Sequence, residues 1–169
     1  MRKLKRWWWV LLVVPLLMGG AFVAWAELGP APMPEAEGAL ASGDGATGVA
    51  VTQDRWLVFR PEDDDVSAGL VLYPGGRVEA AAYAPTARDI AEHGYLVVLV
   101  PMPLDLAFFA PQRADAVQAA FSTVDHWAVG GHSLGGAMAA RYAHNNATAV
   151  DGLLLWAAYP VEGDDLSGY

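Results

Sequence analysis

The most constraining feature of the sequence is a segment in which an apolar run enters a glycine-rich turn. Residues 127–136 read Trp-Ala-Val-Gly-Gly-His-Ser-Leu-Gly-Gly, and an alanine-rich stretch follows at 137–143. The centre of the segment is Gly-x-Ser-x-Gly, which predicts a strand, a sharp turn with Ser133 at its tip, and a helix. Gly131 and Gly135 stand two positions before and after the serine, where strand and helix pass too close for larger side chains.

This predicted turn suits nucleophilic chemistry. Its strained backbone holds the hydroxyl of Ser133 clear of the sheet, and the amides at the start of the helix carry partial positive charge toward any oxyanion that forms beside it. The alternative is a chance match in a glycine-rich loop, which the flanking strand and helix patterns disfavour. We interpret His132 as a packing or orienting residue, because neighbouring side chains on a strand point in opposite directions.

A second pair of glycines, Gly75-Gly76, follows the apolar strand predicted at 68–73. Acyl transfer requires two N–H donors aimed at the developing oxyanion, one from the residue after the serine and one from a loop after an earlier strand. We therefore predict the amides of Leu134 and Gly76 as the donors, with Gly75 or Arg77 as alternatives for the second. A simple glycine turn also remains open, whereas no Gly-Lys-Ser/Thr follows to make a phosphate loop.

The N-terminus begins with four basic residues among the first six, followed by an uncharged run at 7–26 that contains four tryptophans. Twenty helical residues span about 30 Å, the thickness of a bilayer core, whereas the apolar part of a signal peptide is about 7–15 residues long. The run therefore favours an uncleaved single-pass anchor, with its basic end inside and the domain on the extracytoplasmic side of the cell membrane. Ala24-Trp25-Ala26 offers a cleavage site, so secretion after signal cleavage is the alternative.

The charges are distributed unevenly along the chain. All 19 acidic residues follow residue 26, together with six arginines and no lysine, so that part carries a net charge of −13 with neutral histidines. Nucleic acid is excluded as a partner for such a surface. The chain has no cysteine, which excludes disulfides and thiolate metal sites. The four carboxylates at 62–65 lack the spacing of a calcium loop, and we expect neither a metal nor a cofactor.

Three regions are expected: a membrane segment or signal peptide at 1–26, a flexible linker rich in Ala, Gly, Pro and Glu at 27–48, and a domain at 49–169. In the domain, Val51, Trp56 and Val58 are expected to face inward. Strands alternate with helices, which predicts an α/β fold with a mostly parallel sheet and helices on both faces. Beside the strand that enters the turn at Ser133, the expected strands are 49–60, 68–73, 95–101 and 152–158, and the expected helices are 83–93, 111–125 and 137–143.

Four segments in this order, 70–78, 83–91, 94–103 and 131–136, resemble α/β-hydrolases, and among them the small dienelactone-hydrolase-like serine hydrolases. The resemblance implies that Ser133 is the nucleophile, that Leu134 and Gly76 are the oxyanion donors, and that the substrate is a small ester, thioester or related acyl compound. Tyr73-Pro74 departs from the pattern, because many relatives have His-Gly at that place, and this leaves the exact second donor open.

The family order places an Asp or Glu and then a His after the serine. The only later histidine, His144, lies about 16 Å along the helix axis from Ser133, and Asp164 and Asp165 follow the strand at 152–158 too closely to be assigned. His93 and His126 are expected at the opposite edge of the sheet. We therefore expect a domain that is incomplete at its C-terminus, with the catalytic acid and histidine outside this chain. The alternative is a non-catalytic binding or scaffold protein that retains the fold.

Two further expectations concern packing. The apolar loop at 104–109 either lines an acyl pocket or is buried in the core. The strand at 152–158 is expected to be apolar and open along its edge, so a version without residues 1–26 is expected to be aggregated or partly unfolded. The 169-residue chain is also expected to be inactive, because it lacks a general base for Ser133.

Overall fold

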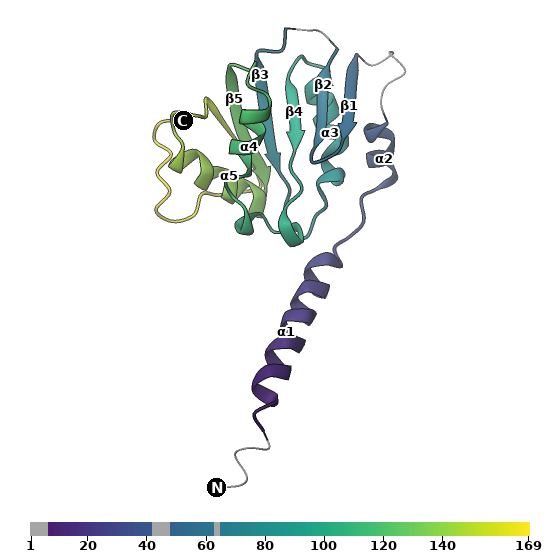
Figure 1. The fold of residues 1–169 in the computed structure, drawn as a ribbon. Helices are drawn as coiled ribbons and strands as arrows, with labels where there is room; N and C mark the ends of the chain where they lie inside the picture. Colours follow the sequence, from purple (N-terminus) through teal and green to yellow (C-terminus); the bar gives the residue numbers. More distant parts are fainter. Residues whose placement is uncertain (1–6, 42–47, 63–64) are drawn as a thin grey trace.

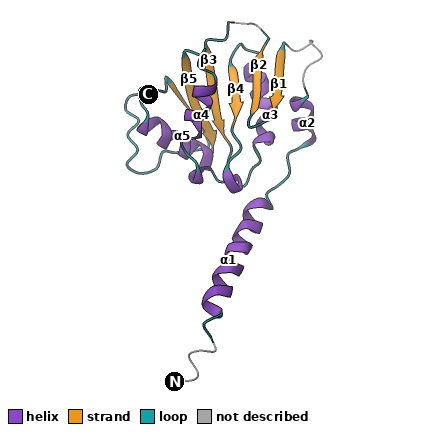
Figure 2. Ribbon diagram, in the orientation of Figure 1, coloured by secondary structure: helices purple, strands orange, loops and turns teal. Residues whose placement is uncertain are grey.

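The computed structural model describes residues 7–41, 48–62 and 65–169, and its main body is a six-stranded sheet with helices on both faces (Figures 1 and 2). The strand order is β1-β2-β4-β3-β5-β6. β1 and β2 form an antiparallel hairpin, β2 pairs antiparallel with β4, and the remaining pairs are parallel. The strands are β1 Val49–Gln53, β2 Leu57–Pro61, β3 Ala68–Tyr73, β4 Leu96–Leu99, β5 His126–His132 and β6 Gly152–Trp156.

Alternation along the central strands divides the core into two apolar layers. Val71 and Tyr73 of β3 pack on the face covered by α4 and α5, whereas Leu70 and Leu72 pack on the face covered by α2 and α3. The structure thus confirms the predicted α/β class with a mostly parallel sheet. The helices are α1 Val10–Glu27, α2 Pro34–Leu40, α3 Ala84–Ala91, α4 Arg113–Ala120 and α5 Leu134–Asn145, with short 3-10 turns η2 Ala80–Tyr83, η3 Pro103–Asp105 and η4 Ala107–Phe109.

The register of β3 against β5 sets the position of the loops that follow them. Tyr73, the last residue of β3, lies opposite Gly131 near the end of β5. Parallel strands end at the same edge of a sheet, so the loop with Gly75 and Gly76 lies beside Ser133. We call this side of the sheet the C-terminal edge.

Several expected boundaries differ from the structure. The single strand expected at 49–60 is wrong: a turn at 54–56 divides it into β1 and β2, although Val51, Trp56 and Val58 are buried as predicted. The helix expected at 111–125 is shorter, since α4 ends at Ala120. The buried strand expected at 152–158 is β6, and all five of its residues are only half-buried. β6 lies at the edge of the described sheet, with β5 as its one partner strand there.

Part of the segment at 27–48, which was expected to be a flexible linker, is helical. Residues 34–40 form α2, with Ala36 and Ala39 buried against the domain. Arg88 of α3 donates from Nε to the carbonyl of Ala39 at 3.0 Å and from its terminal nitrogen to Ala41, which satisfies carbonyls at the end of α2. The small alanines allow this close packing without an apolar repeat that sequence inspection detects. Residues 42–47 of the linker, 63–64 of the acidic turn and the basic cluster within 1–6 lie outside the described residues.

The N-terminal helix α1 projects away from the domain at the C-terminal edge of the sheet (Figure 1). Its 18 residues have a mean hydropathy of 2.0, and only 6% of them are buried against the rest of the protein. The helix is long and apolar enough to cross a membrane, and a signal sequence has the same properties.

Candidate active site

Ser133 occupies the turn between β5 and α5 in a conformation that is rare for a residue with a side chain. Its φ is +51° and its ψ is −120°. Two backbone hydrogen bonds hold the turn: the Ser133 N–H donates to the Trp156 carbonyl at 2.9 Å, and the Ala137 N–H donates to the Ser133 carbonyl at 3.0 Å. The residue is exposed. Such strain is typical of functional turns, where the surrounding structure compensates for its cost.

The glycines on either side of Ser133 allow backbone to meet backbone. A Cβ at Gly131 would lie 2.5 Å from the carbonyl carbon of Gly135 and 2.7 Å from the carbonyl oxygen of Tyr73. A Cβ at Gly135 would collide with the carbonyl oxygens of Tyr73 and Pro74. The end of β3 therefore rests directly on the turn, and any side chain at these two positions would separate them.

The loop after β3 approaches the first residue of α5. A Cβ at Gly76 would face the Leu134 side chain at 3.2 Å. The neighbouring amides are already engaged: the Gly75 N–H donates to the Tyr83 hydroxyl at 3.0 Å, and the Arg77 N–H donates to the Asp105 carbonyl at 2.8 Å. Among the described residues, Gly76 is thus the loop position whose amide has no such acceptor.

His132 and Tyr83 connect the serine turn to this loop. Nδ1 of His132 lies 2.9 Å from the Tyr83 hydroxyl, which also accepts the Gly75 amide. Because the hydroxyl uses its lone pair for the amide, it can donate its proton to Nδ1, which leaves the other ring nitrogen of His132 protonated. Burial raises the pKa of Tyr83, so the phenol keeps its proton near neutral pH. His132 has the orienting contact that its place beside Ser133 predicted.

The other three histidines have partners away from Ser133. Nδ1 of His93 lies 2.6 Å from the Asp89 carbonyl, and Nδ1 of His126 lies 3.6 Å from the carboxylate of Asp151. His93 precedes β4 and His126 is the first residue of β5, so both lie at the opposite edge of the sheet, as expected. Within the described part of the chain, no histidine or carboxylate is hydrogen-bonded to the Ser133 hydroxyl.

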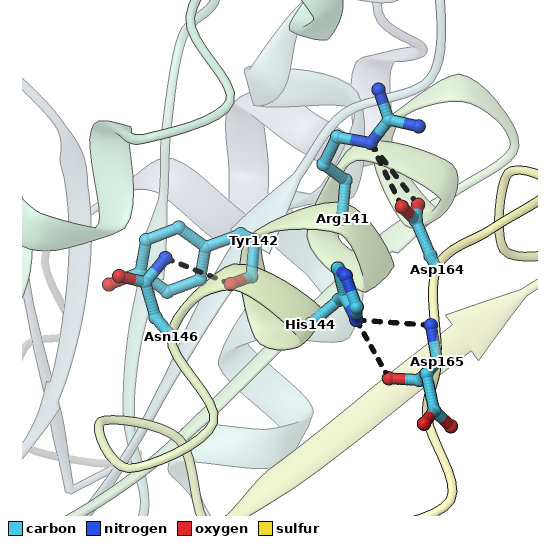
Figure 3. Close-up of polar contacts among 6 residues, drawn as sticks. All are labelled: Arg141, Tyr142, His144, Asn146, Asp164 and Asp165. Carbon is cyan, nitrogen blue, oxygen red and sulfur yellow. Dashed lines mark hydrogen bonds and ion pairs between the residues drawn. The ribbon is translucent and has the colours of Figure 1, made fainter.

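His144 belongs to a set of contacts that holds the C-terminal segment against α5 (Figure 3). The backbone N–H of Asp165 donates to Nδ1 of His144 at 3.0 Å. Nε of Arg141 contacts both carboxylate oxygens of Asp164, at 3.1 and 3.2 Å, and the Asp164 side chain is only 6% exposed. Asp164 and His144 are therefore used in packing the chain's last described residues onto α5. Sequence inspection offers no signal for these pairs, since the partners are more than twenty positions apart.

The loop at 104–109 is only partly buried in the core, and no residue of it lines either of the two pockets described below. Leu106 and Ala107 are buried, and Leu106 comes within 3.7 Å of a Cβ placed on Gly76. Phe108 and Phe109 instead remain about half exposed. Leu104 and Asp105 have positive φ values, so this loop is strained like the turn at Ser133.

Two pockets open at the other edge of the sheet, where the parallel strands begin. An apolar one of about 400 Å³ is lined by residues that include Leu70, Trp127 and Leu154. A polar one of about 470 Å³ is lined by residues that include Arg60 and Asp125. Neither is lined by Ser133 or by the loop after β3, so neither serves the chemistry of the turn.

Comparison with known proteins identifies relatives at the level of family and fold. A sequence model of the alpha/beta hydrolase family matches residues 69–168. No curated protein matches the sequence significantly.

Solved structures with a similar fold include three hydrolases. A bacterial membrane phospholipase A, described as a virulence factor, has a TM-score of 0.55 at 16% identity, and the match covers 93% of this chain and 53% of the phospholipase chain. A bacterial heroin esterase has a TM-score of 0.52 at 19% identity, and the match covers 74% of this chain and 49% of the esterase chain. Brefeldin A esterase, a bacterial homologue of human hormone-sensitive lipase, has a TM-score of 0.50 at 19% identity, covering 79% and 44%. The chain thus spans about half the length of these structures, and at such identities the likeness establishes the fold.

Proposed function

Because the chain belongs to the alpha/beta hydrolase family, we propose that it is a serine hydrolase that cleaves an ester, thioester or related acyl bond through Ser133. The Ser133 oxygen attacks the carbonyl carbon of the substrate while a general base takes the hydroxyl proton. The carbonyl oxygen becomes an oxyanion between the amides of Leu134 and Gly76. Collapse of this intermediate expels the alcohol or thiol, and water then hydrolyses the acyl-enzyme.

The observation that carries this proposal is the backbone of Ser133, whose φ of +51° puts an exposed hydroxyl at the strand–helix turn. The approach of Gly76 to Leu134 supports it, because a Cβ on Gly76 would lie 3.2 Å from the Leu134 side chain and the two proposed donor residues are therefore neighbours in space. Engagement of the Gly75 and Arg77 amides by Tyr83 and Asp105 favours Gly76 over its neighbours as second donor. One such donor contributes about 3–4 kcal/mol to transition-state stabilisation.

The proposal includes anchoring of the domain by α1. The 18-residue helix is apolar up to its last residue, Glu27, and almost unburied, and the basic residues that precede it favour a cytoplasmic N-terminus with the domain on the extracytoplasmic side. A reporter fused after Tyr169 is expected to be exported, and the protein is expected to stay in the membrane fraction after high salt and carbonate. Release of a soluble form beginning near Glu27 would instead identify the segment as a cleaved signal peptide.

The test of the nucleophile is active-site labelling. The full-length protein, prepared from its membrane fraction, should react with a fluorophosphonate probe, and Ser133→Ala should abolish labelling and lower ester hydrolysis by about 10⁴-fold or more. Ser122→Ala, at another exposed serine, is the matched control and should change neither. Labelling that persists in Ser133→Ala would overturn the assignment.

A second function, a non-catalytic binding or scaffold role, is favoured by one observation. All four histidines of the chain contact groups other than the Ser133 hydroxyl. A serine without a general base is a weak nucleophile at neutral pH. Failure of the unmodified protein to react with the probe or to hydrolyse any acyl ester would support this alternative.

A further inference from the structure

The end of α1 is joined to the loop that carries Gly76. Arg77 donates from Nε to the Trp25 carbonyl at 2.8 Å and from its terminal nitrogen to the Leu28 carbonyl at 3.0 Å. Its guanidinium carbon lies 4.5 Å from the centre of the Trp25 ring. Arg77 therefore satisfies carbonyls at the C-terminal end of α1 and stacks on its last tryptophan. A single peptide bond separates this junction from the proposed oxyanion donor.

Tryptophans mark both ends of α1. Trp7, Trp8 and Trp9 precede the helix, and Trp25 stands in its last turn, all at least half exposed. Tryptophan concentrates at the two interfaces of a bilayer, where the ring is apolar and its N–H is polar. Because Arg77 stacks on Trp25, a bilayer that holds α1 places Arg77 at the level of its headgroups.

Further exposed aromatic side chains lie next to the C-terminal half of α1. The rings of Phe22 in α1 and Phe109 in η4 lie 6.5 Å apart, nearly perpendicular. The rings of Phe108 and Phe109 are 4.2 Å apart, and the two residues are 46% and 49% exposed. These two residues lie in the segment that follows β4, at the C-terminal edge of the sheet, and α1 projects from that same edge (Figure 1). Ring contacts thus connect α1 to the segment after β4, in which Leu106 approaches Gly76.

The charges at this junction select among lipids. Glu27, Glu79 and Asp105 lie close enough together that each of the two glutamates raises the pKa of Asp105, after the larger effect of its burial. The chain after residue 26 also carries a net charge of −13. At this junction the three acidic side chains outnumber the Arg77 guanidinium, so anionic headgroups would be repelled more than zwitterionic or uncharged ones.

From this arrangement we propose that the C-terminal edge faces the bilayer that holds α1, and that the substrate is an acyl ester of a zwitterionic or uncharged lipid in that bilayer. The inference deepens the proposed serine hydrolase function and rests on it for its chemistry. Phe108 and Phe109 enter the interface beside the site, so the ester of a lipid reaches Ser133 without leaving the membrane surface.

The orientation is tested without any activity measurement. The chain has no cysteine, so a single cysteine carries a unique fluorophore. Phe109→Cys reports on the C-terminal edge, and Tyr95→Cys, at a residue that is 48% exposed at the opposite edge, is the matched control. In phosphatidylcholine proteoliposomes that contain nitroxide-labelled lipid, the label at 109 should be quenched several-fold more than the label at 95. Equal or reversed quenching would overturn the orientation.

The substrate class is tested with two esters and the full chain in the same proteoliposomes. Phe108→Ser combined with Phe109→Ser should lower hydrolysis of a fluorogenic phosphatidylcholine by about tenfold, because the aromatic contact with the bilayer is lost. Turnover of a short water-soluble ester should stay unchanged, and Tyr95→Ser should affect neither reaction. Replacing a third of the lipid with phosphatidylglycerol should slow the lipid reaction.

Equal loss of both reactions, cleavage of the soluble ester alone, or faster cleavage in anionic vesicles would overturn the substrate assignment. Absence of both reactions would refute the serine hydrolase function and the substrate class with it, while the quenching result would still decide the orientation.

Discussion

Replacing Gly131 with alanine tests the packing of the end of β3 against the serine turn. Gly131 lies in β5 without a positive φ, so the added methyl group changes packing and not backbone preference. The new Cβ would lie 2.5, 2.6 and 2.7 Å from backbone atoms of Gly135, Gly136 and Tyr73. These atoms must move by about 0.3–0.5 Å to reach the 3.0 Å below which Cβ contacts are essentially never seen.

Such a movement is expensive because Tyr73 is held from the other side. Its side chain is fully buried, and its hydroxyl donates to the Pro111 carbonyl at 2.7 Å and accepts the Ala114 N–H at 2.9 Å. We therefore expect Gly131→Ala to lower the free energy of unfolding by about 1–3 kcal/mol, the usual cost of overpacking. Because Gly76 follows Tyr73 by three residues, the proposed oxyanion site should widen, and turnover should fall by up to about 100-fold.

The measurement is equilibrium unfolding by urea, followed by tryptophan fluorescence, with ester turnover measured in parallel. Gly152→Ala is the matched control: it lies in the neighbouring strand opposite Ala128, and its Cβ would meet that residue's Cβ at an ordinary 3.4 Å. This variant should remain within about 0.5 kcal/mol of the unmodified protein. A Gly131→Ala protein as stable and as active as Gly152→Ala would refute the argument that this contact leaves no room.

Three further changes probe separate contacts. Tyr73→Phe removes the buried hydroxyl that joins β3 to α4 and should cost about 1–3 kcal/mol in urea unfolding, because the Ala114 N–H loses its acceptor; an unchanged midpoint would contradict this. Tyr83→Phe frees the Gly75 amide and His132, and should lower kcat by up to about tenfold with KM unchanged; a change in KM alone would assign Tyr83 to substrate binding. The pKa of Asp151 is lowered mainly by the hydrogen bond that its carboxylate accepts from the Trp127 N–H. This hydrogen bond therefore stabilises the folded state at pH values above 3.8, the ordinary pKa of the group, and the stabilisation is lost as the pH falls through the lower pKa of the folded state. Asp151→Asn should therefore flatten the decline of Tm in acid, and a decline as steep as that of the unmodified protein would contradict this reasoning.

The sequence alone determined the features that depend on residues close together in the chain. The strand, turn and helix around Ser133 follow from glycine spacing over a few positions, and the apolar run at 7–26 follows from composition. The alternation of strand and helix patterns along the chain likewise gave the α/β class. Boundaries were less well predicted: the division of 49–60 into β1 and β2 depends on a turn at 54–56 that has neither glycine nor proline.

Tertiary structure alone decided which distant groups meet. β3 precedes β4 in the chain but lies between β4 and β5 in the sheet, and only this order puts Gly76 beside Leu134. The choice of Gly76 over Gly75 and Arg77 as the proposed second oxyanion donor rests on tertiary contacts. The Gly75 and Arg77 amides already donate to Tyr83 and Asp105. The docking of α1 through Arg77 joins residues 49 and 52 positions apart. Periodicity reports the local burial of a segment, whereas these contacts depend on the order of the strands and on the packing of whole elements, which no local pattern specifies.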